Sequence, residues 1–217
     1  AKKLHLHYID SGAMYRAVTL FFLQNGIPIP DPEVVNHNGF DYESVLEKVH
    51  ISFRINPETG FSEVYLNGVN VENDLRSMEI SENVSHVSSI REVRTKMVHL
   101  QQLAGEEGGL VMDGRDIGTT VFPHADLKIF MKADPEIRAQ RRHKEMIAKG
   151  MSVSREEVIQ NLVGRDYEDS HREESPLRKA SDAVILDNSY MNFDEQVEFV
   201  LQELRKLINT ESEEVKS

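Results

Sequence analysis

Residues 109–123 constrain the fold most, because an apolar run there ends in a cluster of charges: the segment reads GLVMDGRDIGTTVFP. Two carboxylates and an arginine at the carboxyl end of a buried strand are typical of a ligand crevice at the edge of a parallel sheet. Residues 8–16, YIDSGAMYR, also pass from a strand through a Ser-Gly turn into an arginine-bearing helix. A surface turn with an ion pair is the alternative for the first segment. The second segment favours the crevice.

Short apolar runs alternate with segments of helical periodicity along most of the chain. This alternation predicts an α/β fold in which a parallel sheet is flanked by helices on both faces. The expected strands are residues 4–9, 110–112, 127–131 and 183–186.

Helix boundaries carry clear signals. Asn25-Gly26 closes a helix over residues 13–24, and Pro135 opens a helix that stops at Gly150. Two capping boxes, Ser89-x-x-Glu92 and Ser154-x-x-Glu157, predict the starts of two further helices. The last helix is expected to end near Asn209 and to bury one stripe, which consists of Phe193, Val197, Val200, Leu204 and Ile208.

Residues 51–71 follow a different period. Apolar and polar residues alternate from Ile51 to Ile55 and again around Val64, and Asn67-Gly68 is a strong signal for a tight hairpin turn. This pattern predicts a small antiparallel meander. Because it interrupts an α/β pattern, we interpret it as an insertion.

The composition excludes several classes of protein. A net charge of −12 argues against a general nucleic-acid binder, whose surface would be basic. The apolar runs are too short to cross a bilayer, and no signal-peptide pattern is visible. The absence of cysteine excludes disulfides and thiolate metal sites and fits a cytoplasmic protein. We therefore expect neither a nucleic-acid partner nor a membrane partner.

Basic residues cluster between Arg138 and Arg178. Within this stretch, Arg165, Asp169 and Arg172 stand at i, i+4 and i+7, so one face of the predicted helix carries all three. Guanidinium groups bind phosphate through paired hydrogen bonds, so the cluster predicts a small polyanionic ligand. A helix face stabilised by solvated ion pairs is the alternative.

Residues 8–16 and 109–123 together resemble the bacterial cytidylate kinases, and the resemblance extends over nearly the whole chain. That family belongs to the nucleoside monophosphate kinases, which have a P-loop NTPase-type core. The resemblance implies transfer of the γ-phosphoryl group of ATP to CMP or dCMP, with Mg²⁺ as cofactor, nucleotides as partners and a monomeric protein. A UMP/CMP-type or adenylate-type kinase is the second possibility within this superfamily.

The resemblance also implies three parts. A nucleotide-monophosphate-binding part, which includes the β insertion, covers about residues 17–94, and a helical lid covers about residues 139–178. The core comprises about residues 1–16, 95–138 and 179–217.

On the acceptor side, the resemblance assigns Arg16 and Arg115 to the acceptor phosphate, with Ser11 and Tyr15 lining the same side. Phosphoryl transfer depends on positioning and on neutralising the phosphoryl oxygens, so Arg115 is also a catalytic candidate. Asp113 ends a central strand and is the candidate for ordering a water bound to Mg²⁺. No residue is expected to bind the metal directly.

On the lid, the resemblance assigns Arg165 and Arg172 to clamping phosphate and Asp169 to accepting hydrogen bonds from ribose hydroxyls. Arg141 and Arg142 resemble hinge arginines that reach the nucleotide triphosphate or the transferring group. These four arginines are the other catalytic candidates.

Three residues match the cytosine-reading positions of the family: Asp116, Arg94 and Ser85. A carboxylate accepts a hydrogen bond from the cytosine N4 amine, and an arginine donates to the ring acceptors N3 and O2. Uracil presents a carbonyl oxygen to that carboxylate, which predicts discrimination through an unpaired polar group. For Ser85 alone, a helix-capping role is the alternative.

No G-x-x-x-x-G-K-[ST] phosphate loop occurs in the 217 residues. Either the natural protein carries this loop before Ala1, or the chain is a non-catalytic nucleotide-binding module. We favour the first, because the acceptor-site and lid residues are all in place. Residues 1–4, AKKL, then resemble the last turn of the helix that follows such a loop.

Overall fold

The computed structural model describes residues 1–30, 39–148, 150–172 and 174–214, with side chains described as far as residue 209. Residues 31–38 of the expected monophosphate-binding part, and residues 149 and 173 of the expected lid, lie outside this range.

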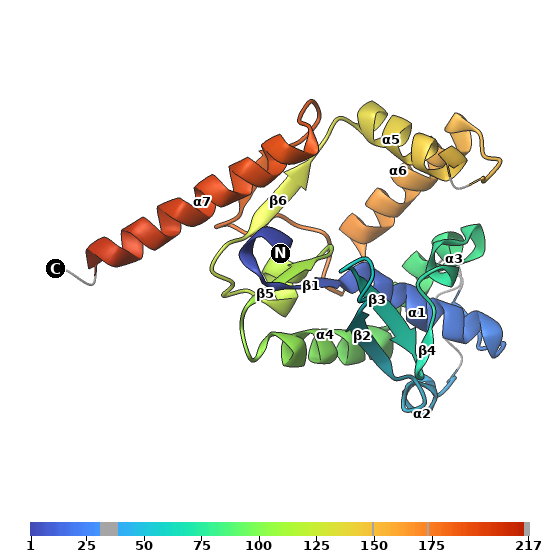
Figure 1. Cartoon of the computed structure of the whole chain (residues 1–217). Coiled ribbons are helices and arrows are strands. Elements are labelled where there is room, and N and C mark those ends of the chain that lie inside the picture. The colour runs from blue at the N-terminus through green and yellow to red at the C-terminus, as the bar shows by residue number, and fades with distance from the viewer. Residues whose placement is uncertain (31–38, 149, 173, 215–217) are drawn as a thin grey trace.

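Parallel strands confirm the α/β prediction. Strand β1 (His7–Asp10) pairs in parallel with β5 (Leu110–Asp113), and β6 (Ile129–Lys132) pairs in parallel with β7 (Val184–Asp187). Within the described residues these are two separate two-stranded sheets (Figure 1). The chain therefore has the expected parallel strands, but they do not join into one sheet.

The first strand is shorter than predicted. Lys2–Leu4 form a 3₁₀ turn, η1, and His5 adopts a left-handed conformation with φ 53°. A left-handed residue cannot continue an extended strand, so β1 begins only at His7. The last helical turn expected within residues 1–4 is present as this 3₁₀ turn over Lys2–Leu4.

The main core surrounds helix α1 (Ser11–Gln24), which packs against α3 (Met78–Ser89) and α4 (Arg91–Gly105). Val18, Phe22 and Met97 are fully buried there, and each such side chain stabilises the fold by roughly 1.5–3 kcal/mol. The short helix α2 (Tyr42–Leu46) closes the far end of this cluster by packing against α4. The core thus fixes the amino end of α1, which lies at the carboxyl end of β1.

The antiparallel insertion is confirmed. Strands β2 (Ile51–Ile55), β3 (Ser62–Leu66) and β4 (Val69–Asn70) form one antiparallel sheet. Asn67 and Gly68 have φ values of 49° and 84°, as a two-residue hairpin turn requires. The sheet packs on α1 through β3, and the 3₁₀ turn η2 (Asp74–Arg76) leads from it to α3.

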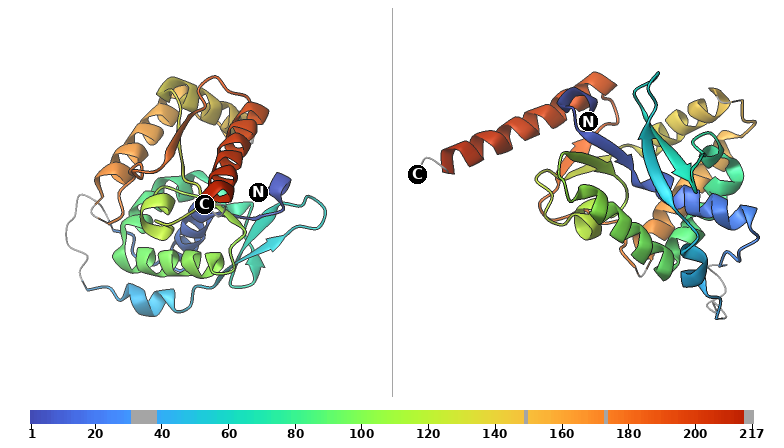
Figure 2. Two further views of the ribbon diagram at one scale, coloured as in Figure 1. Left: turned by 90° about the vertical axis from the view of Figure 1, so that its left-hand side faces the viewer. Right: turned by 60° about the horizontal axis from the view of Figure 1, so that its bottom comes forward.

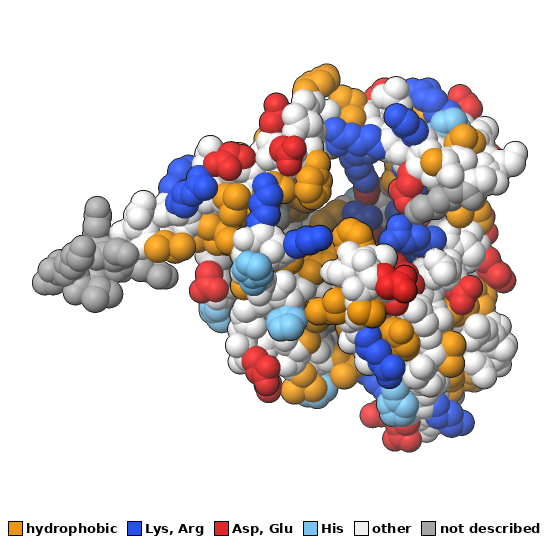
Figure 3. All heavy atoms as spheres, viewed as in Figure 1, with side chains coloured by type: hydrophobic (Ala, Val, Ile, Leu, Met, Phe, Trp, Pro, Cys, Tyr) orange, Lys and Arg blue, Asp and Glu red, His pale blue; other side chains and the backbone are white. Residues whose placement is uncertain are grey.

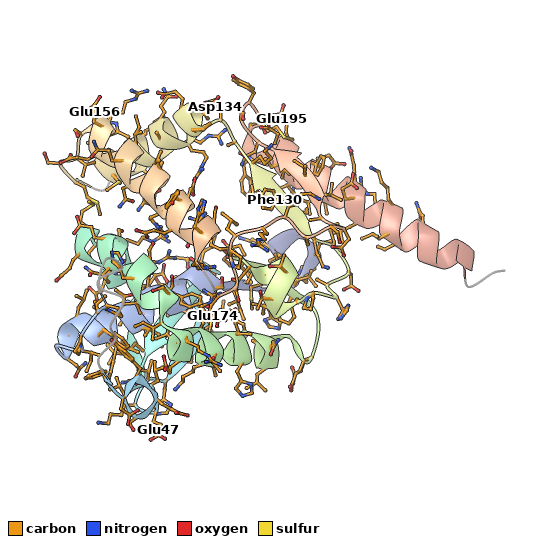
Figure 4. The ribbon with its side chains drawn as sticks, turned by 180° about the vertical axis from the view of Figure 1, so that it is seen from behind. Glu47, Phe130, Asp134, Glu156, Glu174 and Glu195 are labelled. Carbon is orange, nitrogen blue, oxygen red and sulfur yellow. The ribbon has the colours of Figure 1, made fainter. Side chains whose placement is uncertain are left out.

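Helices α5 (Pro135–Ala148) and α6 (Arg155–His171) pack on each other and form an arm beside the sheets (Figures 1 and 2). The predicted capping box is present at Ser154 and Glu157. Figure 4 labels Glu156, in the first turn of α6, at the outer end of this arm, and Asp134, just before α5, at its inner end. The carboxyl end of α6 returns to contact α3.

One prediction about a helix start is wrong. Ser89 does not cap a helix: it is the last residue of α3, and its hydroxyl donates to the His86 carbonyl. Helices α3 and α4 meet directly at Ile90, so the first turn of α4 has no side-chain cap. Helix α3 itself was not predicted, and its cap, Ser77, accepts from the Ile80 amide.

The buried stripe predicted for the last helix is also wrong. Helix α7 (Phe193–Glu214) extends away from the body (Figure 1), so Phe193 is 77% exposed and Ile208 is 61% exposed. Val197, Val200 and Leu204 are only half-buried. The helix also continues past Asn209. None of the helices in the described ranges is both long and apolar enough to cross a lipid bilayer.

Candidate functional site

The turn between β1 and α1 fixes Arg16. Asp10 caps α1, because one of its carboxylate oxygens accepts from the Ala13 amide at 2.9 Å. Its other oxygen lies 2.6 Å from Nη2 of Arg16. A single carboxylate therefore starts the helix and holds the guanidinium that the helix carries. Asp10 was not among the predicted site residues.

The turns after β1 and β5 are bonded to each other. Ser11 is buried, and its hydroxyl donates to the Asp113 carbonyl at 2.6 Å. Any side chain at Gly114 would overlap the Ser11 hydroxyl and would lie 2.8 Å from the Ile117 side chain. Ser11 was predicted to line the acceptor side. In the structure, its hydroxyl bonds the turn after β1 to the turn after β5. The segment then turns through η3 (Ile117–Val121), a π-type turn.

A buried ion pair lies behind these turns. The Arg94 guanidinium, from α4, donates to the Asp116 carboxylate, and the two side chains are 4% and 5% exposed. Arg94 also donates to the Ser88 carbonyl at 3.3 Å and lies 5.6 Å from the centre of the Tyr15 ring. The alternative of a solvated surface ion pair is wrong for Asp116, because solvent does not reach this pair.

Several buried polar atoms next to this pair have no hydrogen bond of normal geometry within the described residues: the Ser85 hydroxyl, Nε of Arg94, and the Tyr15 hydroxyl and Gln101 amide, which lie close to each other. Buried polar groups in folded proteins are almost always paired, so such a cluster indicates a place where a ligand supplies the partners. Burial raises the pKa of Tyr15 to about 12, so its hydroxyl stays a neutral donor. Ser85 lies inside α3, which makes its helix-cap alternative wrong.

The carboxyl end of α6 brings the predicted lid residues together. Asp169 is buried and lies between two arginines, with one oxygen 3.1 Å from Nη1 of Arg172 and the other 3.2 Å from Nε of Arg115. Arg172 stands just past the helix end, not on the helical face, and also donates to the Ser175 carbonyl. Because Asp169 is buried, the alternative of solvated ion pairs is wrong here.

Arg165 adds positive charge to this region. Burial lowers the pKa of its guanidinium, and the nearby Arg115, Arg16 and Arg142 lower it further, while Asp169 opposes them. Within the described ranges Arg165 forms no ion pair, and its Nε is buried without a partner. The site therefore holds arginines whose mutual repulsion a bound polyanion would relieve.

Two carboxylates face each other at the ends of the first pair of strands, since Asp10 is the register partner of Asp113. Desolvation and the neighbouring Asp10 raise the pKa of Asp113, and the Tyr8 hydroxyl donates to it at 3.2 Å. In the part of the chain that the structure describes, no group of three or more metal-ligating side chains is arranged around a metal position.

Arg141 and Arg142, the two arginines predicted to lie at the lid hinge, have different partners. Arg141 donates to the carbonyls of Asn188 and Ser189 at 2.8 and 3.0 Å, so it holds the loop after β7. Arg142 pairs with Glu145 at 3.0 Å and is close enough to Arg165 to lower its pKa. The structure thus brings Arg142, but not Arg141, to the arginine cluster.

Figure 3 shows a hollow between the arm and the body of the molecule, bordered by Lys and Arg side chains. An α/β core with buried polar groups beside converging arginines fits the nucleoside monophosphate kinase class of phosphotransferase, in which positive charge positions phosphate groups. Residues 1–206 match the model of the family described as Cytidylate kinase. This chain belongs to that family.

Bacterial proteins named cytidylate kinase are similar to the chain over almost its whole length. One from Bacteroides thetaiotaomicron is 52% identical over 211 residues, which are 96% of this chain and 89% of that protein. One from Parabacteroides distasonis is 49% identical, over 97% of this chain and 90% of that protein. One from Flavobacterium johnsoniae is 49% identical, over 93% of this chain and 86% of that protein.

Proposed function

We propose that this chain phosphorylates CMP or dCMP with the γ-phosphoryl group of ATP, giving CDP or dCDP. The observation that carries the proposal is the buried Arg94–Asp116 pair beside the unpaired Ser85 hydroxyl, in a chain of the cytidylate kinase family. An adenylate-type or UMP/CMP-type kinase and a non-catalytic nucleotide-binding module are not favoured, because the relatives carry the name cytidylate kinase.

The base is read at the buried Arg94–Asp116 pair. Asp116 accepts from the N4 amine of cytosine while Arg94 donates to its ring acceptors, and the unpaired Ser85 hydroxyl is available as a further donor or acceptor. Asp116 is already paired with Arg94, so the carboxylate is held in place before the nucleotide arrives. Such a preformed site costs little reorganisation on binding.

The acceptor phosphate lies among Arg16, Arg115 and Arg165, whose positive charges repel one another in the free chain. Asp169 accepts from the ribose hydroxyls, and Arg172, which Asp169 holds, adds charge on the lid side. Phosphoryl transfer leaves little covalent chemistry for the protein to carry out. Fixed positive charge around the phosphoryl oxygens therefore supplies most of the catalysis. Arg142 is the hinge arginine that supplements this charge.

ATP brings Mg²⁺, which neutralises phosphate charge and is held mainly by phosphate oxygens and water. Asp113, with Asp10 beside it, would order that water from the ends of β1 and β5. We keep the division into core, monophosphate-binding part and lid at the expected boundaries, supported by the insertion on α1 and by the α5–α6 arm. A cytoplasmic location, favoured by the absence of cysteine, and a monomeric state complete the proposal.

Two measurements test this function. Calorimetric titration of the chain with CMP, dCMP and UMP should give binding of the cytosine nucleotides that is at least about 10-fold tighter than that of UMP. A coupled assay of ADP release by the full-length natural protein should show turnover with CMP. Equal affinity for CMP and UMP, or turnover with AMP but not with CMP, would contradict the proposal.

A further inference from the structure

Asp166 joins three segments of the chain and has no role in the site described above. Its carboxylate accepts from Arg138, in the first turn of α5, through both oxygens: one bond is 3.1 Å long, and the second is from Nη1 of Arg138. The oxygen that accepts the 3.1 Å bond also lies 3.5 Å from Nη1 of Arg115, in the turn after β5. A residue of α6 thus connects α5 to the turn that carries the acceptor-site arginine.

The bond to Arg138 anchors this carboxylate to the inner end of the arm. The backbone amide of Asp134, just before α5, donates to the Ser189 hydroxyl at 2.8 Å, and Arg141 of the same helix holds the loop after β7. Arg138 therefore stands on a helix whose start is bonded to the loop after β7. Burial alone would raise the pKa of Asp166, but Arg138 and Arg115 hold it below its usual value, so the carboxylate stays charged.

Two of the three guanidinium nitrogens of Arg115 have acidic neighbours. Its Nε faces Asp169 and its Nη1 faces Asp166, whereas no partner within the described residues contacts its Nη2. We propose that Asp166, fixed by Arg138, is a positioning residue that holds Arg115 with Nη2 available to a phosphate oxygen of the acceptor nucleotide. Both oxygens of Asp166 are already engaged by arginines, so it acts through Arg115 rather than on the substrate.

The charge balance agrees with this role. Arg138 and Arg115 share the Asp166 carboxylate, so the three groups keep a net positive charge beside the phosphate position. A small displacement of a positioned group can lower a rate by about 10²-fold, because the reacting atoms lose their alignment. The inference rests on the proposed function, since Arg115 is an acceptor-phosphate residue only in that function.

The kinetic test uses Asp166→Asn in the full-length protein, because asparagine keeps the shape and one acceptor but loses the charge. We expect kcat to fall by about 10- to 100-fold while KM for CMP changes by less than about 3-fold. Glu156→Gln is the matched control: it removes one charge from the exposed outer end of the same helix and should leave kcat unchanged.

A double-mutant cycle separates positioning from a general structural role. In an Arg115→Ala background, Asp166→Asn should lower kcat no further, because the group that it positions is gone. If Asp166→Asn lowers kcat by the same factor in both backgrounds, or leaves kcat intact in the otherwise natural protein, the inference is wrong.

A readout independent of turnover keeps the inference distinct from the proposed function. The Nε–H signal of Arg115 in ¹⁵N-resolved NMR spectra, assigned through an Arg115→Lys variant, reports how firmly the guanidinium is held. Its exchange with solvent should accelerate in Asp166→Asn and not in Glu156→Gln. An unchanged exchange rate in Asp166→Asn overturns the positioning role, even if the protein phosphorylates CMP. An accelerated exchange rate supports the positioning role, even if the protein does not phosphorylate CMP.

Discussion

The Nε atom of Arg115 lies 3.2 Å from a carboxylate oxygen of Asp169, and this contact joins the turn after β5 to the carboxyl end of α6. Asp169 also holds Arg172, so two arginines from segments more than fifty residues apart meet on one buried carboxylate. Asp169 therefore links the turn after β5 to the end of α6, which the proposed function assigns to the acceptor side and to the lid.

From this coupling we predict that Arg172→Ala lowers kcat strongly and changes CMP affinity less. Arg172 reaches the site from the lid, and lid contacts strengthen when charge develops on the transferring group. We expect a loss in kcat of about 10²-fold or more. Steady-state kinetics and CMP titration on the full-length protein check this. Weakened CMP binding with intact kcat would make Arg172 a ground-state clamp instead.

Arg16→Ala should act in the opposite way, mainly on binding of the acceptor. Arg16 is fixed in the core by Asp10 and does not depend on lid closure. Losing one charged hydrogen bond to the phosphate should weaken CMP binding by about 10- to 100-fold. Calorimetry with CMP and with cytidine separates the loss of the phosphate contact from any damage to base and ribose binding. Cytidine has no phosphate, so it should bind the variant and the natural chain with the same affinity.

For base recognition, Asp116→Ala should lower kcat/KM for CMP by at least about 10²-fold and for UMP by much less. The structure adds a second consequence, because Asp116 is the buried partner of Arg94. Removing one partner of a buried ion pair costs about 3–5 kcal/mol of stability. Asp116→Asn is therefore the milder companion variant. Both variants should lower the ratio of kcat/KM for CMP to kcat/KM for UMP. A ratio unchanged in folded protein would show that Asp116 does not read the base.

A pair of glycine substitutions tests the packing at the site. At Gly114 a methyl group would overlap the Ser11 hydroxyl, so Gly114→Ala should destabilise the chain by about 1–3 kcal/mol. At Gly164, inside α6, the same methyl group meets open space. There Gly164→Ala should stabilise the helix by about 0.5–1 kcal/mol. Thermal unfolding of both variants gives the comparison, and a neutral Gly114→Ala would mean that the two turns do not approach as closely as described.

The raised pKa of Asp113 predicts a pH dependence with a defined sign. A carboxyl whose folded-state pKa is raised binds its proton more tightly in the folded chain, so ionising it at neutral pH destabilises the fold. That penalty disappears as pH falls through the folded pKa. Asp113→Asn should therefore raise Tm at neutral pH, and the gain should shrink toward about pH 4. Identical Tm values for Asp113→Asn and the natural chain at neutral pH would contradict the predicted direction of the change in stability.

The sequence by itself determined several of the local elements. Asn67-Gly68 turned as expected, because few other residues adopt positive φ, and the Ser154–Glu157 capping box formed, because its two bonds lie within one helical turn. The same spacing at Ser89 and Glu92 formed no capping box, because α3 runs up to Ser89 and meets α4 directly, so a local signal holds only where the neighbouring elements allow it. Asp10, which caps α1, carried a comparable local signal as an acidic N-cap and could have been found in the same way.

Only the tertiary structure decided which charges meet and which apolar faces are covered. Arg138 and Asp166 are 28 residues apart, and Arg94 and Asp116 are 22 apart, so no spacing rule joins them. The apolar stripe of α7 repeats with helical period, yet Phe193 stays exposed because no described segment packs on it. Pairing and burial depend on how separate elements pack in space. A one-dimensional pattern states which residues are able to pair, and the packing of the elements selects the partners.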